Sequence, residues 1–186
     1  MLYIEKVTTN RTAFEKKVAD IAAKLGFNPD WLMLVMWIEC RLDPTRINPI
    51  SKAAGLIQFM PKTLAAFGLT TAQMRAMSNL QQLDYVYKFL LPYRNKVKNY
   101  LDMYLAVFFP AAMGKALTAT VEAKNLSAGL IARQNKGYDI NKDGRITLQE
   151  IASVIYKQVP KSFAGTFQLL KDGVTDLVKK KVLPQV

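Results

Sequence analysis

Apolar residues recur every three or four positions along most of the chain, which is the spacing of one face of an α-helix. The first such stretch comprises Phe14, Val18, Ile21, Ala22 and Leu25. Turn and capping residues mark further helices, which we expect at 29–42, after 61, and at 78–91, 98–109, 115–131 and 148–158. No region is rich in strand signals, although residues 43–60 have room for a short β-hairpin. The pattern predicts a mainly α-helical protein whose residues 1–186 form a single domain.

The second expected helix is apolar on every face. Its sequence reads NPDWLMLVMWIECRL, and eight consecutive apolar residues precede Glu39. A helix that is apolar all round is buried, so we expect Glu39 at the edge of the hydrophobic interior. Desolvation disfavours the charged form of a carboxyl group and raises its pKa. A carboxylic acid that is neutral near physiological pH can protonate a leaving oxygen, as glycoside cleavage requires. An ion pair with Arg41 or Arg46 is the alternative.

The last stretch of the chain combines an apolar stripe at helical spacing with several lysines. We expect a basic C-terminal helix over about 161–186 that packs on the domain, because such stripes usually face a core. A helix that lies on a membrane surface is the alternative.

Composition adds a strong positive charge. The 26 Lys and Arg residues against 14 Asp and Glu residues give a net charge of +12, which favours a polyanionic partner such as nucleic acid, an anionic membrane surface or an anionic wall polymer. No nucleic-acid-reading motif is present, so we expect no specific nucleic-acid partner. The absence of histidine excludes His-dependent bases and zinc ligands. Cys40 is the only cysteine, which excludes an intramolecular disulfide, and we expect it to be a small buried side chain.

Residues 139–150, DINKDGRITLQE, match the EF-hand calcium-loop pattern D-x-[DN]-x-[DN]-G-x5-E in full. Oxygen ligands at this spacing surround Ca²⁺ at about 2.3–2.6 Å. Gly144 permits the sharp turn, and we expect Ile146 to pair with a neighbouring segment. The expected ligands are Asp139, Asn141, Asp143, the carbonyl of Arg145, Thr147 and both carboxylate oxygens of Glu150. One such loop predicts one structural Ca²⁺ rather than a switch. The alternative is a solvated turn before a helix with a Thr147–Glu150 capping box.

Residues 28–63 resemble the core of the lytic transglycosylase (SLT-domain) family, whose fold is lysozyme-like and of the goose type. The resemblance rests on a helix that ends in a glutamate, here Glu39, and on a Gly-Leu-x-Gln-x-Met-Pro motif, here GLIQFMP at 55–61. It extends over roughly residues 12–115. Inserted calcium loops also occur in this family, so the two motifs are compatible.

The resemblance implies an enzyme that cleaves the β-1,4 bond between N-acetylmuramic acid and N-acetylglucosamine in peptidoglycan. Glu39 is then the sole acid and base, the product is a 1,6-anhydro sugar, and the chemistry needs no cofactor. The resemblance also implies a set of substrate-binding residues, which are Gly55, Gln58, Met60, Cys40, Tyr104 and Phe109.

Two positions depart from the family pattern. Cys40 stands where the family has serine, which weakens any hydrogen bond from this side chain. The third family motif, A-Y-N-A-G-like, corresponds to YLAVFFPAAMG at 104–114. Phage wall-degrading proteins with F-[FY]-P-A-A at this place are the better match, and Phe109 then takes the aromatic position. Plain helix packing is the alternative for this stripe.

The start of the sequence lacks the basic and apolar segments of a secretory signal, and the longest apolar run, 31–38, is too short to span a bilayer. Together with the charge, this favours a phage-encoded endolysin or virion-associated lysin. We expect it to act in the host periplasm or cell wall after release or virion delivery, as a monomer or in a phage assembly. One alternative is a hydrolytic muramidase of the same fold, with Asp43 or Asp84 as second carboxylate. Another is a non-enzymatic calcium-binding module.

Overall fold

The computed structural model describes residues 1–124 and 126–167. The chain forms two compact units, unit 1 with residues 1–98 and unit 2 with residues 99–186. The regular elements of the described residues are helices, accompanied only by isolated β-bridges. The predicted mainly α-helical class is confirmed, and the single folding domain stays a prediction.

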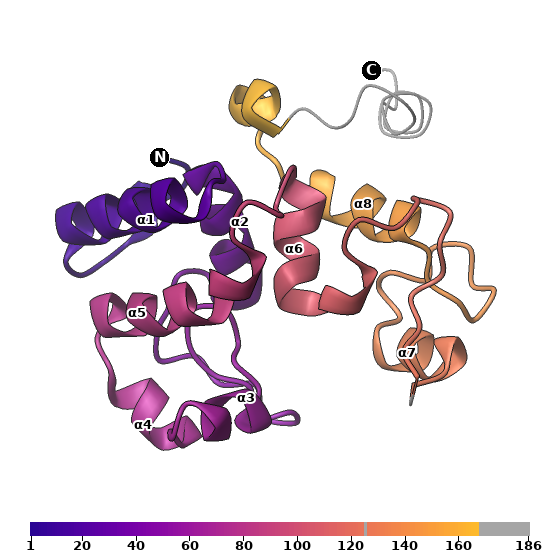
Figure 1. Ribbon diagram of the computed structural model, residues 1–186, viewed down its shortest axis with the longest axis horizontal. Coiled ribbons are helices and arrows are strands. Elements are labelled where there is room, and N and C mark those ends of the chain that lie inside the picture. The colour runs from indigo at the N-terminus through magenta and orange to yellow at the C-terminus, as the bar shows by residue number, and fades with distance from the viewer. Residues whose placement is uncertain (125, 168–186) are drawn as a thin grey trace. The chain divides into compact units, whose positions relative to one another are not determined.

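Unit 1 is built on two helix pairs that share one helix. Helix α1 packs against both α2 and α5, and Figure 1 shows these helices in indigo to magenta. The core between them holds fully buried residues such as Val18 of α1, Leu34 of α2 and Val86 of α5. The elements of unit 1 are η1 (Ile4–Lys6), α1 (Arg11–Leu25), α2 (Pro29–Cys40), α3 (Pro61–Ala66), α4 (Thr71–Ala76), α5 (Asn79–Leu90) and η2 (Leu91–Tyr93).

Local side-chain caps determine where several of these helices begin. The Asn28 side chain accepts a hydrogen bond from the N–H of Asp30 at the start of α2. Ser78 and Gln81 form the capping box of α5, where the predicted helix starts. The six residues of α4 form too short a segment to show a helical period, and only its capping residue Thr70 signals it in the sequence.

The segment between α2 and α3 carries short antiparallel bridges rather than a full hairpin. Ala54 bridges to Ile47 on one side and to Phe59 on the other. The β-hairpin for which the sequence had room is therefore not formed, and only isolated bridges are present in this segment. These bridges place the 55–61 motif next to residues 46–48.

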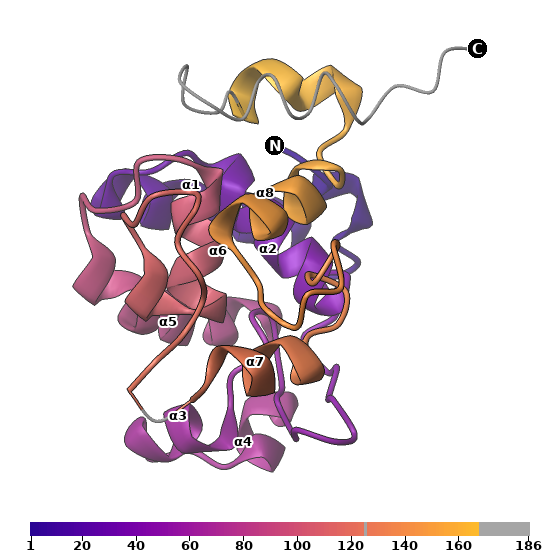
Figure 2. The same cartoon turned by 90° about the vertical axis from the view of Figure 1, so that its right-hand side faces the viewer.

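Unit 2 consists of short helices around a long loop. Its described elements are α6 (Tyr100–Phe108), η3 (Pro110–Ala112), α7 (Ala128–Gln134), α8 (Leu148–Tyr156) and η4 (Lys161–Phe167). Figure 2 shows α7 and α8 at the two ends of the loop that contains residues 139–147. Phe167 of η4 packs edge-on against Tyr100 of α6, with ring centroids 5.1 Å apart.

The helix expected over residues 115–131 is a wrong prediction for most of its length. Among the described residues of this range, only those of α7, which begins at Ala128, are helical. Before it, Thr120 bridges antiparallel to Thr147, Val121 donates its N–H to the Ile146 carbonyl (2.7 Å), and Leu148 donates to the Ala119 carbonyl (3.0 Å). Pairing with this distant segment satisfies backbone groups that a helix would otherwise satisfy, so tertiary context overrides local preference.

The predicted basic C-terminal helix begins with η4, a 3-10 helix over Lys161–Phe167. Residues 168–186 of that prediction lie outside the described residues. In the part of the chain that is described, no helix combines the length and the apolar character needed to cross a membrane.

Candidate active site

Glu39 is the penultimate residue of α2. The residues Leu32 to Met36 are fully buried, whereas Glu39 itself is partly exposed. The helix ends one residue later, at Cys40, because Arg41 and Leu42 adopt left-handed backbone angles, φ 58° and 61°. Arg41 donates its N–H to the Trp37 carbonyl (3.0 Å). The apolar run therefore carries Glu39 to the margin of the core and then turns away.

Burial raises the pKa of the Glu39 carboxyl to about 7. Desolvation is the cause, and no described residue forms a hydrogen bond or ion pair with this carboxyl. The guanidinium of Arg41 instead lies over the Trp37 ring, 4.9 Å from its centroid. The expected rise in pKa is confirmed, and the alternative of an ion pair is not supported. Below pH 7 this side chain is an uncharged proton donor.

The 55–61 motif forms a tight turn whose conformation requires its glycine. Gly55 has φ 79°, and a Cβ atom there would lie 2.6 Å from the side-chain oxygen of Gln82. Gln58 also has a left-handed φ of 49°, and its Nε2 donates to the carbonyl of Gly55 (3.0 Å) and more weakly to that of Arg46 (3.3 Å). Gly55 therefore shapes the turn and Gln58 holds it closed.

The predicted substrate-binding residues of this motif differ in accessibility. Gln58 is partly exposed and Met60 is 50% exposed, so both side chains can meet a ligand. Gly55 is buried, as suits a residue that only shapes the turn.

Cys40 lies under the motif instead of facing a substrate. It is 1% exposed, and its Sγ is 3.3 Å from the carbonyls of both Met36 and Leu56. Burial raises the pKa of this thiol to about 12, so it is neither a nucleophile nor a charged group. We therefore correct the predicted substrate contact: Cys40 joins α2 to the motif and positions the residue before it, Glu39.

Gln82 is a further residue of the site that the sequence prediction missed. It is fully buried on α5. Its Nε2 donates to the carbonyls of Pro44 (2.7 Å) and Met74 (2.8 Å), and its Oε1 accepts from the N–H of Leu56 (2.9 Å). One side chain thus ties the loop after α2, the motif and α4 together. A polar residue in phase with the buried Leu83 and Val86 is the signal that would have revealed it.

The two carboxylates considered for hydrolysis have other partners. Asp43 accepts hydrogen bonds from the N–H (2.8 Å) and the hydroxyl (2.7 Å) of Thr45, so it caps the turn after α2. Asp84 forms an ion pair with Lys17 at 2.7 Å. Both are exposed.

A comparison with known families identifies this helical arrangement. Residues 17–86 match the family model of the transglycosylase SLT domain. The family comprises lytic transglycosylases that act on peptidoglycan, so unit 1 carries the lysozyme-like domain of a peptidoglycan-degrading enzyme. Neither a curated protein nor a solved structure matches the chain. The matched segment includes Glu39, the 55–61 motif and Gln82, and it ends before α6.

Beyond the SLT domain, unit 2 holds the remaining predicted substrate residues on and after α6. Tyr104 is 2% exposed, and its hydroxyl shares a short hydrogen bond with the hydroxyl of Tyr138. Phe108 packs beside both, with its ring centroid 5.5 Å from Tyr104 and 5.3 Å from Tyr138. The predicted substrate contact of Tyr104 is therefore corrected to a packing role. Phe109 is partly exposed at the end of α6, and its role stays a prediction.

The loop of residues 139–150 is closed by its own side-chain oxygens. The two carboxylate oxygens of Asp139 accept from the N–H groups of Asp143 and Gly144, each at 3.1 Å. Asn141 Oδ1 accepts from the N–H of Asp143 (3.0 Å), and Asp143 Oδ1 accepts from that of Arg145 (2.8 Å). Gly144 has φ 79°, which is the turn that its position predicted.

Ile146 and Glu150 complete the loop. Ile146 is fully buried and pairs with the segment around Val121, as predicted. Glu150 Oε2 accepts from the N–H and the hydroxyl of Thr147, each at 2.9 Å, and its Oε1 accepts from the N–H groups of Ile140 (3.1 Å) and Asn141 (3.3 Å). The capping box of the alternative interpretation is therefore present.

The donor chemistry of this loop suits Ca²⁺, because carboxylate, amide, hydroxyl and carbonyl oxygens are its preferred ligands. Among residues 1–124 and 126–167, however, no three Asp, Glu, Cys or His side chains gather by themselves as a metal site. Binding of Ca²⁺ would also need oxygens of Asn141 and of the backbone. The Glu150 side chain, which now accepts hydrogen bonds from loop N–H groups, would have to rotate toward the ion. The calcium site and its ligands, including Arg145, stay predictions.

Proposed function

We propose that this protein is a lytic transglycosylase that cleaves the β-1,4 bond between N-acetylmuramic acid and N-acetylglucosamine, with Glu39 as its single acid and base. One observation carries the proposal. Glu39 combines a pKa of about 7 with the absence of any charged partner among the described residues, and it lies within the segment that matches the SLT domain.

In the proposed reaction the proton of Glu39 passes to the glycosidic oxygen while the bond from that oxygen to C1 of the muramic acid breaks. The resulting Glu39 carboxylate accepts the proton of the muramic acid 6-hydroxyl. At the same time the oxygen of that hydroxyl forms a bond to C1. The product is a 1,6-anhydro ring, no water is consumed, and Glu39 regains its proton. The described hydrogen bonds of Gln58 hold the turn beside which the glycan would lie.

The surroundings of the other acids favour this reaction over hydrolysis. A hydrolytic muramidase usually places a second carboxylate to activate water or to act as the nucleophile. Asp43 is engaged with Thr45, and Asp84 is paired with Lys17. Neither carboxylate is therefore available in the arrangement that hydrolysis needs.

Turbidity loss of a cell-wall suspension, followed by mass analysis of the products, tests the proposal. We expect Glu39→Gln to lower the cleavage rate by about 10²–10⁴-fold, the usual contribution of general acid–base catalysis. Asp43→Asn is the matched control, because the amide oxygen keeps the bonds to Thr45, and it should remain active. Reducing ends in place of anhydro ends would establish the muramidase, and unchanged lysis by Glu39→Gln would favour a non-enzymatic calcium-binding module.

We further propose that residues 139–150 bind one structural Ca²⁺ that takes no part in the chemistry. The support is the complete ligand pattern and the loop conformation, in which side-chain oxygens of Asp139, Asn141 and Asp143 accept hydrogen bonds from N–H groups of the same loop.

We also propose that the protein is a phage endolysin or virion-associated lysin. The net charge of +12 and the FFPAA segment at 108–112 support this origin. Neighbouring genes test it: lysis genes favour an endolysin, and virion structural genes favour a virion-associated lysin. A bacterial chromosomal locus outside any prophage would contradict both.

A further inference from the structure

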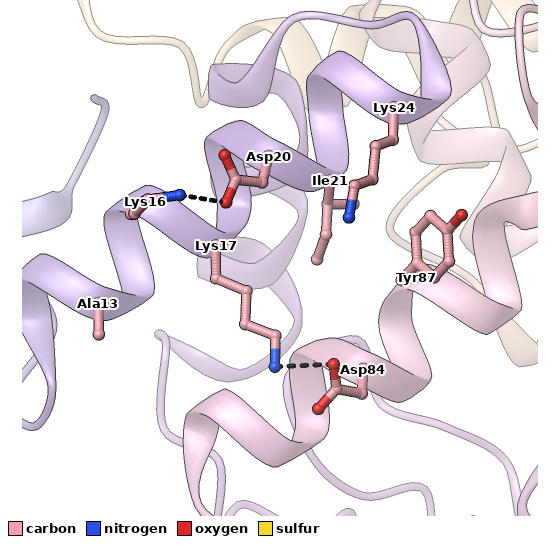
Figure 3. A pocket seen from close by; sticks show the side chains of 8 residues that line it. All are labelled: Ala13, Lys16, Lys17, Asp20, Ile21, Lys24, Asp84 and Tyr87. Carbon is pink, nitrogen blue, oxygen red and sulfur yellow. Dashed lines mark hydrogen bonds and ion pairs between the residues drawn. The ribbon is translucent and has the colours of Figure 1, made fainter.

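A hollow of about 370 Å³ lies between α1 and α5 of unit 1, and Glu39 is not among the residues that line it. Figure 3 shows side chains from both helices pointing toward this space. A second hollow of about 450 Å³ adjoins it on α5 and shares Asp84 and Tyr87 with it. Tyr85 and Lys88 also line this second hollow. We call the two hollows together the α1–α5 groove.

Ion pairs fix the walls of the groove. Lys17 spans the two helices, with its Nζ 2.7 Å from both the Asp84 carboxylate and the Leu80 carbonyl. Lys16 pairs with Asp20 on α1, also at 2.7 Å (Figure 3). The contacts of Lys17 therefore join α1 to α5 across the groove without a ligand.

Two further lysines lie over tyrosine rings. Lys24 Nζ lies over the Tyr87 ring, 5.9 Å from its centroid, and Lys88 Nζ lies over the Tyr85 ring at 4.7 Å. Neither lysine is in an ion pair within the described part of the chain. Both side chains are exposed and both tyrosine rings are half-buried. The groove thus offers two tyrosine rings, each next to a lysine ammonium group that is in none of the ion pairs of the described residues.

This combination fits a glycan that carries isolated carboxylates. The apolar body of a tyrosine ring can stack on a sugar ring while its hydroxyl stays polar. Lys24 and Lys88 can each bind a carboxylate, and Asp20 and Asp84 can accept hydrogen bonds from hydroxyl and amide groups. The same two aspartates would repel a continuous phosphate backbone, which disfavours single-stranded nucleic acid.

We propose that the α1–α5 groove is a secondary binding site for intact peptidoglycan strands, separate from the residues around Glu39. The identity of the polymer rests on the proposed function, because peptidoglycan is the carboxylate-bearing glycan on which an SLT domain acts. The groove holds the enzyme on insoluble wall material while the reaction takes place elsewhere on unit 1.

Co-sedimentation with purified insoluble walls tests the site. All variants carry Glu39→Gln, so that the walls stay intact. Lys24→Gln with Lys88→Gln removes the two cations of the groove. Lys6→Gln with Lys62→Gln is the matched control, because it removes the same charge from exposed lysines that do not line the groove. We expect about three- to tenfold weaker wall binding for the groove pair than for the control pair.

A substitution of the ring separates stacking from charge. Tyr87→Leu should weaken wall binding, whereas Tyr87→Phe, which keeps the ring, should retain most of it. Melting curves of each variant show that the fold is intact. Equal losses for the groove and control pairs would overturn the proposal, because binding would then reflect net charge alone. A loss of single-stranded DNA binding by the groove pair, with wall binding unchanged, would overturn it in favour of a nucleic acid.

The outcome stays distinguishable from that of the proposed function. With Glu39 intact, the groove pair should digest insoluble walls more slowly than the control pair and cleave short soluble wall fragments at the same rate. If the wild type cleaves neither, the proposed function fails, and the sedimentation difference still decides whether the groove binds walls.

Discussion

Glu39 and Glu150 are carboxylates at opposite ends of helices and in opposite surroundings. Glu39 lies at the C-terminal end of α2, where buried apolar residues precede it and no described group bonds to its carboxyl. Glu150 lies in the first turn of α8, where both of its oxygens accept hydrogen bonds from Thr147, Ile140 and Asn141. Apolar surroundings without donors favour the protonated form of Glu39, whereas the oxygens of Glu150 are used to close the loop. One residue type thus suits proton donation in unit 1 and loop closure in unit 2.

The largest effect on stability is expected where the SLT domain depends on one buried amide. Gln82→Leu leaves the N–H of Leu56 and the carbonyls of Pro44 and Met74 without their partner. We expect a loss of at least about 3 kcal/mol in the free energy of unfolding, because each unsatisfied buried group costs about 1–3 kcal/mol. Urea unfolding measures it. Gln81→Leu, on the exposed face of the same helix, removes only a cap and should cost about 1 kcal/mol. Equal effects of the two changes would show that Gln82 does not organise the site.

The surroundings of Glu39 predict that stability depends on pH. Its pKa is about 7 in the folded protein against 4.5 in the unfolded chain. Between pH 4.5 and pH 7, Glu39 keeps its proton in the folded protein but has lost it in the unfolded chain. The free energy of unfolding of the wild type therefore falls as pH rises through this range, and it levels off above pH 7. Glu39→Gln lacks this charge and should be more stable than wild type by up to about 3 kcal/mol at about pH 8, with no difference at about pH 4.

Urea unfolding of both proteins across this range measures the difference, and a difference that stays constant with pH would contradict the raised pKa. Cleavage offers an independent measurement. Because the protonated form is the acid, the rate with wild type should fall as pH rises through about 7.

The 139–150 loop of unit 2 predicts that Ca²⁺ affects the stability of the protein. If the loop binds Ca²⁺ only in the folded protein, Ca²⁺ at about 100 times its Kd should stabilise it by about 2.7 kcal/mol and raise the Tm, and a chelator should reverse the shift. Glu150→Gln keeps the capping box, since glutamine also serves at this position, but removes the carboxylate and should abolish the shift. Glu39→Gln should keep it. A melting curve indifferent to both Ca²⁺ and chelator would refute the calcium site.

The smallest effect concerns the hydroxyl pair that links Tyr104 of α6 to Tyr138, the residue before the 139–150 loop. Tyr138→Phe removes the hydrogen bond to Tyr104 and should cost about 1 kcal/mol in the free energy of unfolding. Tyr104→Phe should also destabilise the protein, and the double variant should cost less than the sum of the two single changes, because the shared bond is lost only once. Strictly additive losses in this cycle would show that the two hydroxyl groups do not interact.

Several features of this protein follow from its sequence alone. The apolar run before Glu39 predicts a buried helix and a raised pKa, and both are present. The Ser78–Gln81 capping box and the turn at Gly144 are equally local. They can be predicted because helical periodicity, side-chain caps and the conformational freedom of glycine act over only a few neighbouring residues.

Only the tertiary structure decided the features that depend on distant backbone. Cys40 is buried because the Leu56 carbonyl lies over it, and Gln82 is essential to the turn because three separate segments present it with hydrogen-bonding groups. Residues 117–121 are not helical, because segment 146–149 offers their backbone groups hydrogen-bonding partners. The α1–α5 groove exists only where two helices meet. A buried polar group must form its hydrogen bonds with whichever partner the fold brings close to it. That partner can lie far away along the chain, so a local sequence pattern does not reveal it.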